Sequence, residues 1–384
     1  MTLIQNARSV RFVAVSTRYL ASQVEDDLAT KMVFVVGPRQ VGKTTLALDL
    51  PGARAGYLNW DVPADRERIL RRELPATGFW VFDELHKYRP WRNFLKGLYD
   101  ARRQGQRILV TGSGRLELFS FGGDSLQGRY HLHRLHPFSV AEAGIDDAGG
   151  LADLLRLGGF PEPFLGGKEI EARRWSRQNR TRLIEEDVTG MTSIRDLGRL
   201  EEMMLRLPDL VGSPLSINAL REDLQVAHKT VAAWLDTLER LFALFRLPPF
   251  GAPRIRAVKQ ERKHYHFDWS LVADPASRFE NLVACHLQKW VHFRQDTQGR
   301  DLELRFFRDV DGREVDFVVL EDRQPAMLVE CKLADRDIDR GLRYLKIRFP
   351  NADAYQIALS GQRDYVSPHG IRAMPALDFL RTLS

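Results

Sequence analysis

A glycine-rich loop near the N-terminus has the clearest potential for chemistry. It reads Gly37-Pro38-Arg39-Gln40-Val41-Gly42-Lys43-Thr44-Thr45 and matches the pattern Gly-x-x-x-x-Gly-Lys-Ser/Thr in full. In such a loop, glycines let backbone N–H groups close around phosphates, the lysine brings positive charge to the β- and γ-phosphates, and the next hydroxyl binds Mg²⁺. The loop lies between the apolar run Met32–Val36 and a predicted helix over Lys43–Leu50, whose N-terminus adds partial positive charge. We therefore predict a site for ATP and Mg²⁺, with Lys43 at the phosphates and Thr44 at the metal.

Two acids end a second apolar run, Phe79–Phe82. Asp83 is expected to hold Mg²⁺ through water, and Glu84 to orient and deprotonate the attacking water. A glutamate directly after the aspartate is typical of ATPases with an additional strand and unusual in nucleotide kinases. The alternative is an acidic strand end that faces solvent. Together with the loop upstream, the pair predicts that ATP is hydrolysed.

Two further residues are candidates for catalysis at the γ-phosphate. The apolar run Ile108–Thr111 is followed by Gly112-Ser113-Gly114, and a small polar residue there can sense the γ-phosphate. We predict Ser113 in this role, with Thr111 as the second choice and a plain Gly/Ser turn as the alternative. Arg129 precedes a predicted strand and is expected to stabilise transition-state charge in its own or a neighbouring site. A surface ion pair is the alternative for Arg129.

Charged residues also mark two predicted strands near the C-terminus, Glu314–Leu320 with Asp316 and Met327–Leu333 with Glu330 and Lys332. Because side chains alternate along a strand, Glu330 and Lys332 share a face. An Asp followed by Glu-x-Lys on the adjacent strand is the arrangement of the restriction-endonuclease-like fold. Asp316 and Glu330 would then bind a divalent cation, and Lys332 would position water. Glu280, on a predicted helix over Phe279–Trp290, would complete the carboxylate set. A hairpin with a cross-strand Glu–Lys pair is the alternative.

A helix-turn-helix pattern lies between these two regions. Ser216 can cap a helix with Ile217, Leu220 and Leu224 on one face, and a turn over 225–227 precedes a second helix with apolar residues spaced by three and four. The opposite face of the second helix and the basic stretch after it are candidates for DNA contact. These candidates are His228, Lys229, Thr230, Thr237 and Arg240 on the helix, and Arg254, Arg256, Lys259, Arg262, Lys263 and His264 in the stretch. A solvated face or a protein interface is the alternative.

The elements that must position these residues predict an α/β fold. Short apolar runs alternate with helical segments up to about residue 165, which implies a parallel sheet of the P-loop NTPase type. Breakers over 144–150 and 158–163 suggest a boundary, and residues 168–247 are predicted to be almost all helix. Strands return at Tyr265–Trp269 and Leu302–Phe307. A helical winged-helix domain and an α/β restriction-endonuclease-like domain are therefore expected after the ATP-binding domain.

Length and composition support a multidomain protein of a reducing compartment. The chain has 384 residues, which favours two or three domains, and a net charge of +6, which fits a polyanionic partner. Its two cysteines, Cys285 and Cys331, cannot form a disulfide framework or a zinc site, so a cytoplasmic location is expected. Arginines interrupt the N-terminal apolar run, and no apolar stretch has the length to cross a bilayer, so neither a signal peptide nor a membrane partner is expected.

Five segments carry a resemblance to a known family. In chain order they are the phosphate loop, Val-Phe-Asp-Glu-Leu-His-Lys over 81–87, Thr-Gly-Ser over 111–113, Gly-Arg-Tyr over 128–130 and Gly-Gly-Phe-Pro-Glu over 158–162. Together the segments resemble a widespread group of prokaryotic AAA-type ATPases. In that group, the ATPase core is followed by a C-terminal domain of unknown function with a winged helix and a nuclease-like fold.

The resemblance extends over nearly the whole chain and implies three domains. These are an AAA-type P-loop ATPase domain over residues 1–165, a helical linker and winged helix-turn-helix over 166–255, and a restriction-endonuclease-like domain over 256–384. The resemblance also implies the roles given above for the phosphate loop, Asp83 and Glu84, and places Arg129 in the Gly-Arg position. In the nuclease-like domain it implies Asp316, Glu330 and Lys332.

Three functions remain open from the sequence. The leading one is an ATP-hydrolysing protein that binds DNA through Lys229, Thr230, Arg254 and Arg256. The second is an ATP-gated, metal-dependent nuclease for genome defence or DNA processing. The third is a nucleotide-dependent switch that binds a partner protein. A homo-oligomer is left open, and Arg18 and Tyr19 are the candidates for contact with the adenine base.

Overall fold

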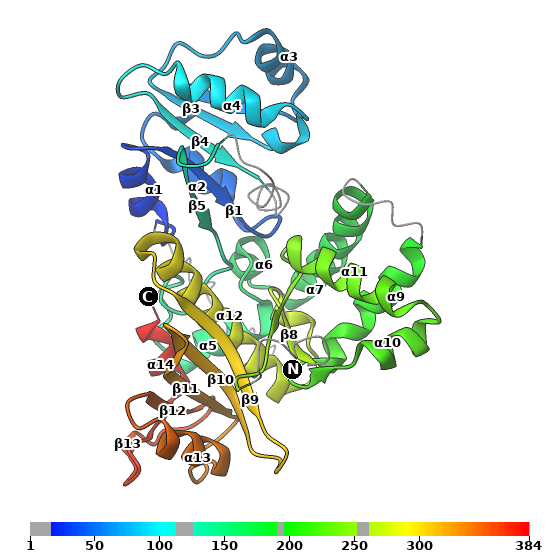
Figure 1. Ribbon diagram of the computed structural model, residues 1–384, viewed down its shortest axis with the longest axis vertical. Coiled ribbons are helices and arrows are strands. Elements are labelled where there is room, and N and C mark those ends of the chain that lie inside the picture. Colours follow the sequence, from blue (N-terminus) through cyan, green and yellow to red (C-terminus); the bar gives the residue numbers. More distant parts are fainter. Residues whose placement is uncertain (1–16, 113–125, 190–195, 252–260, 384) are drawn as a thin grey trace, which may run out of the picture.

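The computed structural model describes residues 17–112, 126–189, 196–251 and 261–383. Figure 1 shows a first sheet with its helices at the top, a largely helical region at the right, and a second sheet at the bottom. Ser113, Arg254, Arg256 and Lys259 lie outside the described residues. None of the helices within those ranges is both long and apolar enough to cross a bilayer.

The first sheet contains five parallel strands in the order β2-β3-β4-β1-β5. The strands are β1 (Met32–Val36), β2 (Tyr57–Asn59), β3 (Phe79–Asp83), β4 (Arg107–Thr111) and β5 (Tyr130–Arg134). All five residues of β1 are buried, as expected for a parallel sheet covered on both faces. The order places β4 between β1 and β3, which is the additional strand predicted from the Asp-Glu pair. The predicted parallel sheet of the P-loop NTPase type is confirmed.

Short helices connect these strands and cover the sheet. They are α1 (Ala21–Asp27), α2 (Lys43–Asp49), η1 (Ala53–Gly56), α3 (Pro63–Arg71), η2 (Leu85–Lys87) and α4 (Trp91–Asp100). The phosphate loop joins the end of β1 to the start of α2, and Asp83 ends β3. Because the strands are parallel, their carboxyl ends meet at one edge of the sheet, and this edge brings the loop and the two acids together.

The region after the first sheet is less helical than predicted. Its helices are α5 (Ala148–Leu157), α6 (Pro161–Gly166), α7 (Glu169–Arg182), the π-helix η4 (Leu183–Val188), α9 (Leu197–Arg206), η5 (Leu207–Leu210), α10 (Ile217–Leu224) and α11 (His228–Arg240). The prediction of helix through residue 247 is wrong at β6 (Pro214–Leu215) and β7 (Leu244–Leu247), since both pair antiparallel with β8 (Arg262–His266). The predicted strand at Tyr265–Trp269 is also displaced, because Asp268 caps a 3₁₀ turn, η7 (Trp269–Leu271), there.

The predicted pair of helices, α10 and α11, is confirmed. The Ser216 hydroxyl accepts a hydrogen bond from the Ala219 N–H at 3.3 Å and so caps α10. Gln225 adopts a left-handed conformation, with φ of 53°, and turns the chain toward α11. The apolar faces of both helices are buried in one cluster with α9. The buried apolar residues of the pair are Leu220, Leu224, Val231, Trp234, Leu235 and Leu238.

The second sheet is mixed, with the order β13-β14-β12-β11-β10-β9. Its strands are β9 (Leu302–Arg308), β10 (Glu314–Glu321), β11 (Gln324–Lys332), β12 (Asp353–Ala358), β13 (Tyr365–Val366) and β14 (Arg372–Pro375). Strands β9, β10 and β11 are antiparallel neighbours, whereas β12 is parallel to both β11 and β14. Two helices, α13 (Arg340–Arg348) and α14 (Ala376–Thr382), belong to this part of the chain.

A long helix, α12 (Pro275–Gln298), connects the two sheets. It is longer than the predicted helix over Phe279–Trp290. It contacts β5 of the first sheet as well as β8, β9 and β11 (Figure 1). Arg134 of β5 donates to Asp296 near the end of α12, with Nη2 and Oδ1 2.5 Å apart. Helix α12 is therefore in contact with both sheets.

Candidate functional site

The phosphate loop has a backbone shape that only glycine allows at two positions. Gly42 has φ of 97°, and a Cβ there would lie 2.9 Å from the Arg18 guanidinium. A Cβ on Gly37 would lie 2.2 Å from the carbonyl oxygen of Leu135. Atoms at that distance overlap, so both glycines are required for the loop to close at the end of β1.

Lys43 is buried within this loop. Its ammonium donates to the carbonyl oxygens of Pro38 at 2.7 Å and Gly37 at 3.1 Å. Burial lowers the pKa of Lys43 to about 8, and the nearby charges of Glu84 and Asp83 only partly oppose this effect. A buried cation that bonds only to carbonyl oxygens is electrostatically under-compensated. Phosphate oxygens are the ligands that would compensate it, so the loop fits a nucleotide.

Three hydroxyl groups converge on the carboxylate of Asp83. Thr111 Oγ1 donates to Oδ1 at 2.6 Å, and Thr44 Oγ1 and Tyr57 Oη donate to Oδ2 at 2.7 and 2.9 Å. The structure thus brings together Thr44 and Asp83, the two predicted Mg²⁺ ligands. Their oxygen atoms are the donor type that Mg²⁺ prefers, so the residues fit the ion. Tyr57 was missed from the sequence, because only the pairing of β2 with β3 brings it to Asp83.

Glu84 occupies a strained position directly after β3. Its φ is 55°, a left-handed conformation that non-glycine residues rarely adopt outside functional sites and tight turns. Glu84 Oε2 lies 3.4 Å from Lys87 Nζ and 3.7 Å from His86 Nε2. Burial, opposed by Lys87 and Lys43, raises the pKa of the Glu84 carboxyl above its usual range. A carboxylate with a raised pKa is a better proton acceptor, which suits a general base.

Of the two other predicted catalytic residues, only Arg129 lies in the described part of the chain, and it does not join this group. Ser113 lies outside the described residues, whereas its alternative, Thr111, is fully buried and bonds to Asp83. The Arg129 carbonyl accepts the Met32 N–H at the start of β1, so Arg129 lies at the edge of the sheet opposite the phosphate loop. Its guanidinium pairs with Asp100 at 2.8 Å. In this arrangement Arg129 cannot reach the site of its own chain, and a role in a neighbouring chain stays a prediction.

A phosphate-loop residue contacts the helical region directly. Arg39 Nη1 lies 2.5 Å from Glu186 Oε2 and 3.6 Å from Asp187 Oδ2. Both acids belong to the π-helix η4, a rare element that occurs often at functional sites. These contacts were missed from the sequence, because nothing in a run of Glu-Glu-Asp distinguishes partners of the loop from solvated acids.

Arg18 and Tyr19 support the loop from behind, and their expected contact with the adenine base stays a prediction. The Arg18 guanidinium donates to the carbonyl of Val41 in the loop, to His136 O at 2.6 Å and to Glu142 Oε1 at 2.5 Å. Tyr19 Oη donates to a backbone carbonyl of β5. Glu142 also accepts from Lys289 Nζ of α12 at 2.5 Å. A buried polar chain therefore runs from the phosphate loop to α12.

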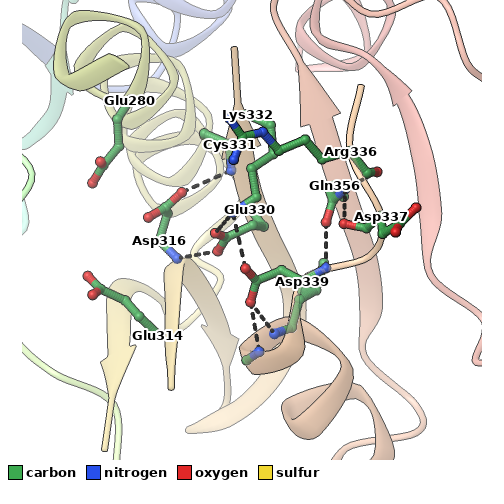
Figure 2. A network of polar contacts seen from close by, with 12 residues as sticks. Glu280, Glu314, Asp316, Glu330, Cys331, Lys332, Arg336, Asp337, Asp339 and Gln356 are labelled. Carbon is green, nitrogen blue, oxygen red and sulfur yellow. Dashed lines mark hydrogen bonds and ion pairs between the residues drawn. The ribbon is translucent and has the colours of Figure 1, made fainter. Parts of the chain in front are cut away.

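The residues predicted for a nuclease-like site lie close together (Figure 2). Asp316 on β10 accepts the Cys331 N–H at 2.9 Å, and its own N–H donates to Glu330 Oε2 at 3.2 Å. Lys332 Nζ donates to Glu330 Oε1 at 2.7 Å and to Asp339 Oδ2 at 3.1 Å. Glu280 faces the group from α12, and Glu314 from the start of β10. The carboxylate cluster is here defined as Glu280, Glu314, Asp316, Glu330 and Asp339.

A protein cation lies inside this cluster. Lys263 Nζ, from β8, is 2.6 Å from Glu314 Oε1, 3.2 Å from Glu280 Oε1 and 3.8 Å from Asp316 Oδ1. Its side chain is only 1% exposed. Within the described residues, no group of three or more His, Cys, Asp or Glu side chains is arranged to hold a metal ion. The cluster in this arrangement therefore does not fit a divalent cation, although the predicted ligands are adjacent.

Burial and like charges raise the pKa values of three acids of the cluster, Glu280, Asp316 and Glu330. Burial, with the charge of Asp316 as the next contribution, raises the pKa of Glu280 to about 7. Burial also raises the pKa values of Asp316 and Glu330. The pKa of Lys263 is raised above its usual value by Glu280, Asp316 and Glu314, which outweigh its own burial. Lys263 is therefore a permanent cation in the folded protein.

Of the predicted DNA contacts on the second helix, those in its first turn and Arg240 at its end are accessible. His228 and Lys229 are exposed and Thr230 is half-buried, in the first turn of α11. Thr237 is buried and donates to the Ala233 carbonyl, so its predicted place on a groove-facing surface is wrong. The same prediction is wrong for two residues of β8. Lys263 lies in the carboxylate cluster, and His264, with a pKa lowered to about 4 by burial, contacts Leu207 O at 2.8 Å.

Comparison with known proteins identifies the first of these regions. The family model of an AAA domain matches residues 29–144. Two domains of unknown function, DUF8612 and DUF4143, match residues 149–280 and 277–379. No curated protein matches the chain.

Two solved structures of archaeal ATPases are similar at low identity. The Walker-type ATPase PABY2304 of Pyrococcus abyssi has 15% identity and a TM-score of 0.45, over 69% of this chain and 96% of that one. The signal transduction ATPase PH0952 of Pyrococcus horikoshii, with a tetratricopeptide repeat sensor, has 14% identity and a TM-score of 0.22, over 71% and 47%. Both TM-scores lie below 0.5, so neither likeness indicates a function. The parallel sheet, the phosphate loop and the match of residues 29–144 to an AAA domain together support a P-loop ATPase domain, followed by two regions that match domains of unknown function.

Proposed function

We propose that this protein hydrolyses ATP with Mg²⁺ and uses its nucleotide state to control a DNA-binding winged helix. The observation that carries the ATPase proposal is the geometry at the edge of the first sheet. Thr44 and Asp83 lie 2.7 Å apart through their side-chain oxygens, and Glu84 follows Asp83 in the chain. The DNA proposal rests on the α9 to β8 region and is tested separately below.

Each residue of the site has a distinct role in this mechanism. Lys43 exchanges its carbonyl partners for the β- and γ-phosphate oxygens, and the N–H groups of the loop bind the same phosphates. Thr44 and, through water, Asp83 would hold Mg²⁺, which supplies positive charge to the phosphates. Glu84 accepts the proton of the attacking water. Thr111 keeps the Asp83 carboxylate in position.

Because burial lowers the pKa of Lys43 to about 8, ATP binding is expected to weaken above that pH. Bound phosphates favour the ammonium and so raise its pKa. Below pH 8, Lys43 is already protonated and binding takes up no proton. Above pH 8, binding takes up one proton, and affinity falls by up to about tenfold per pH unit. Calorimetric titration of a non-hydrolysable ATP analogue in buffers of different ionisation enthalpy measures this uptake.

Lys43→Arg is the control and should show no proton uptake on binding. An affinity of the wild-type protein that is unchanged between pH 7 and 9.5 would contradict the lowered pKa of Lys43.

The winged-helix proposal rests on the order of elements from α9 to β8. A helix, a short strand, two packed helices and two further strands follow one another, and the sheet order is β6-β8-β7. In winged helices the second helix of the pair enters the major groove with its N-terminal residues at the bases. In this chain those residues are His228, Lys229 and Thr230. Farther along α11, Asp236 and Glu239 carry negative charge, so the proposed contact is confined to the first turn.

Substituting Lys229 should test this contact. Lys229→Ala is expected to weaken binding to all duplex sequences and to lower the slope of log affinity against log salt by about one. Lys168→Ala is the matched control, because Lys168 is an exposed lysine next to Glu171 and lies outside the helix pair. Fluorescence anisotropy with labelled duplex DNA at several salt concentrations measures both quantities. Equal slopes for the two variants would exclude Lys229 from the DNA contact.

Two routes could couple the nucleotide to the rest of the chain. The pair of Arg39 with Glu186 joins the phosphate loop to η4, which leads toward the helix pair. The chain of Arg18, Glu142 and Lys289 joins the back of the loop to α12. Phosphate binding at the loop adds negative charge beside Arg39, which competes with Glu186 for the guanidinium. This competition is the proposed switch.

Two alternative functions remain under this proposal. The adjacency of Asp316, Glu330 and Lys332 favours an ATP-gated nuclease, and α12, β9 to β11, α13 and β12 are compatible with a restriction-endonuclease-like fold. The Lys263 ammonium in the cluster opposes cleavage in this arrangement. A protein-interaction switch would use the same ATPase and helix pair, and it predicts that neither DNA affinity nor its salt slope depends on Lys229.

A further inference from the structure

Lys263 belongs to a different sheet from most of the carboxylate cluster that surrounds it. It belongs to β8, in the sheet formed with β6 and β7, whereas Glu314 and Asp316 belong to β10 of the second sheet. Tyr265, two residues later on β8, donates to the same Glu280 oxygen as Lys263, at 2.6 Å. Alternation along the strand directs both side chains into the cluster.

The position of the ammonium is that of a bound cation. Three carboxylates surround it at 2.6 to 3.8 Å, and the side chain has almost no exposure to solvent. Carboxylate oxygens gathered from separate elements are also how proteins bind hard divalent cations. A divalent cation at the point that the Lys263 ammonium occupies would touch it directly, and their repulsion in a buried site would be strong.

The cluster has an excess of acid, and within the described part of the chain Lys263 and Lys332 are the cations paired with it. Lys332 contacts Glu330 and Asp339, which leaves Glu280, Glu314 and the outer oxygen of Asp316 to Lys263. Removal of one partner from a buried ion pair leaves an uncompensated charge. The vacated space would then be lined by oxygen atoms with unmet charge.

We propose that the Lys263 ammonium is the resident cation of the carboxylate cluster: it fastens β8 to the second sheet and excludes divalent metal ions while it is in place. Metal-dependent chemistry at Asp316 and Glu330 would require β8 to withdraw. This inference goes beyond the proposed ATPase, because it involves neither ATP nor DNA.

Metal binding by a lysine variant tests this inference. All proteins carry Asp83→Asn, so that the phosphate loop contributes no metal site, and Mn²⁺ binding to the full chain is followed by the loss of the free-ion EPR signal. With Lys263→Ser, one Mn²⁺ should bind at least about 100-fold more tightly than to protein that retains Lys263. Adding Asp316→Asn should abolish this binding. Lys168→Ser is the control for loss of a lysine and should gain no site.

Two outcomes would overturn the inference. One is a folded Lys263→Ser protein that gains no Mn²⁺ site. The other is protein with Lys263 intact that binds Mn²⁺ at a site removed by Asp316→Asn, since lysine and metal would then coexist. If Lys263→Ser does not fold, Lys263→Gln takes its place, because it removes the charge and its amide oxygen is a ligand that Mn²⁺ accepts. The comparison of intact Lys263 with Asp316→Asn needs no lysine variant, and Mn²⁺ binding that Asp316→Asn removes would overturn the inference by itself.

Discussion

Glu84→Gln is expected to bind ATP normally and to lower its turnover by about 10² to 10⁴-fold, the usual contribution of a general base. Glutamine has the same shape as glutamate but cannot accept the proton of the attacking water. Binding should survive because the groups that hold the phosphates, Lys43 and the loop backbone, are unchanged. Glu84 lies beside Lys87 at 3.4 Å, and a partly exposed pair of this kind contributes little to stability.

The measurement for Glu84→Gln has two parts. Equilibrium binding of a fluorescent ATP analogue gives the affinity, and single-turnover phosphate release gives the rate of the chemical step. Glu67→Gln is the matched control, since Glu67 is an exposed acid on α3 that pairs with Arg71. A Glu84→Gln protein with the turnover of the control would mean that another group activates the water.

Lys43→Ala has the second large effect, which is on binding. Loss of a charged hydrogen-bond donor to the phosphates should weaken ATP binding by about 10- to 150-fold. The nucleotide-free protein should be at least as stable as wild type, because burial already disfavours this ammonium and lowers its pKa to about 8. A residue that destabilises the free protein but strengthens ligand binding is a functional rather than a structural one.

Thermal unfolding distinguishes these two roles of Lys43. The Tm of nucleotide-free Lys43→Ala should equal or exceed that of wild type, whereas added ATP·Mg²⁺ should raise only the wild-type Tm substantially. Lys31→Ala, at a lysine before β1, is the control and should keep the ATP-dependent rise. A Lys43→Ala protein that is less stable without nucleotide would show that Lys43 supports the loop itself.

The first sheet could be predicted because its signals are local. Buried parallel strands such as β1 and β3 appear as short, uninterrupted apolar runs, and the phosphate loop has a fixed pattern between a strand and a helix. Parallel strands then place Asp83 beside Thr44 without further information. Tyr57 could not be predicted, since its contact with Asp83 depends on the lateral order of β2 and β3.

The predictions that were wrong concern residues whose structure depends on contacts with segments far away in the sequence. Strands β6 and β7 have two and four residues and exist because β8 pairs with both. Sequence periodicity cannot separate such short apolar runs from the end of a helix. Lys263 and His264 were assigned to a basic surface because charged residues are usually exposed. The acids that bury Lys263 come from α12 and β10, and only the folded chain brings these elements to β8.

The most direct test of the central claim is the rate of phosphate release by the full chain with and without duplex DNA at low salt, with Glu84→Gln measured beside it. The account predicts that wild type releases phosphate from ATP·Mg²⁺, that DNA accelerates the release, and that Glu84→Gln releases almost none in either condition. A wild-type rate that DNA does not change would contradict the proposed coupling. Equal rates for wild type and Glu84→Gln would contradict the assignment of the catalytic site.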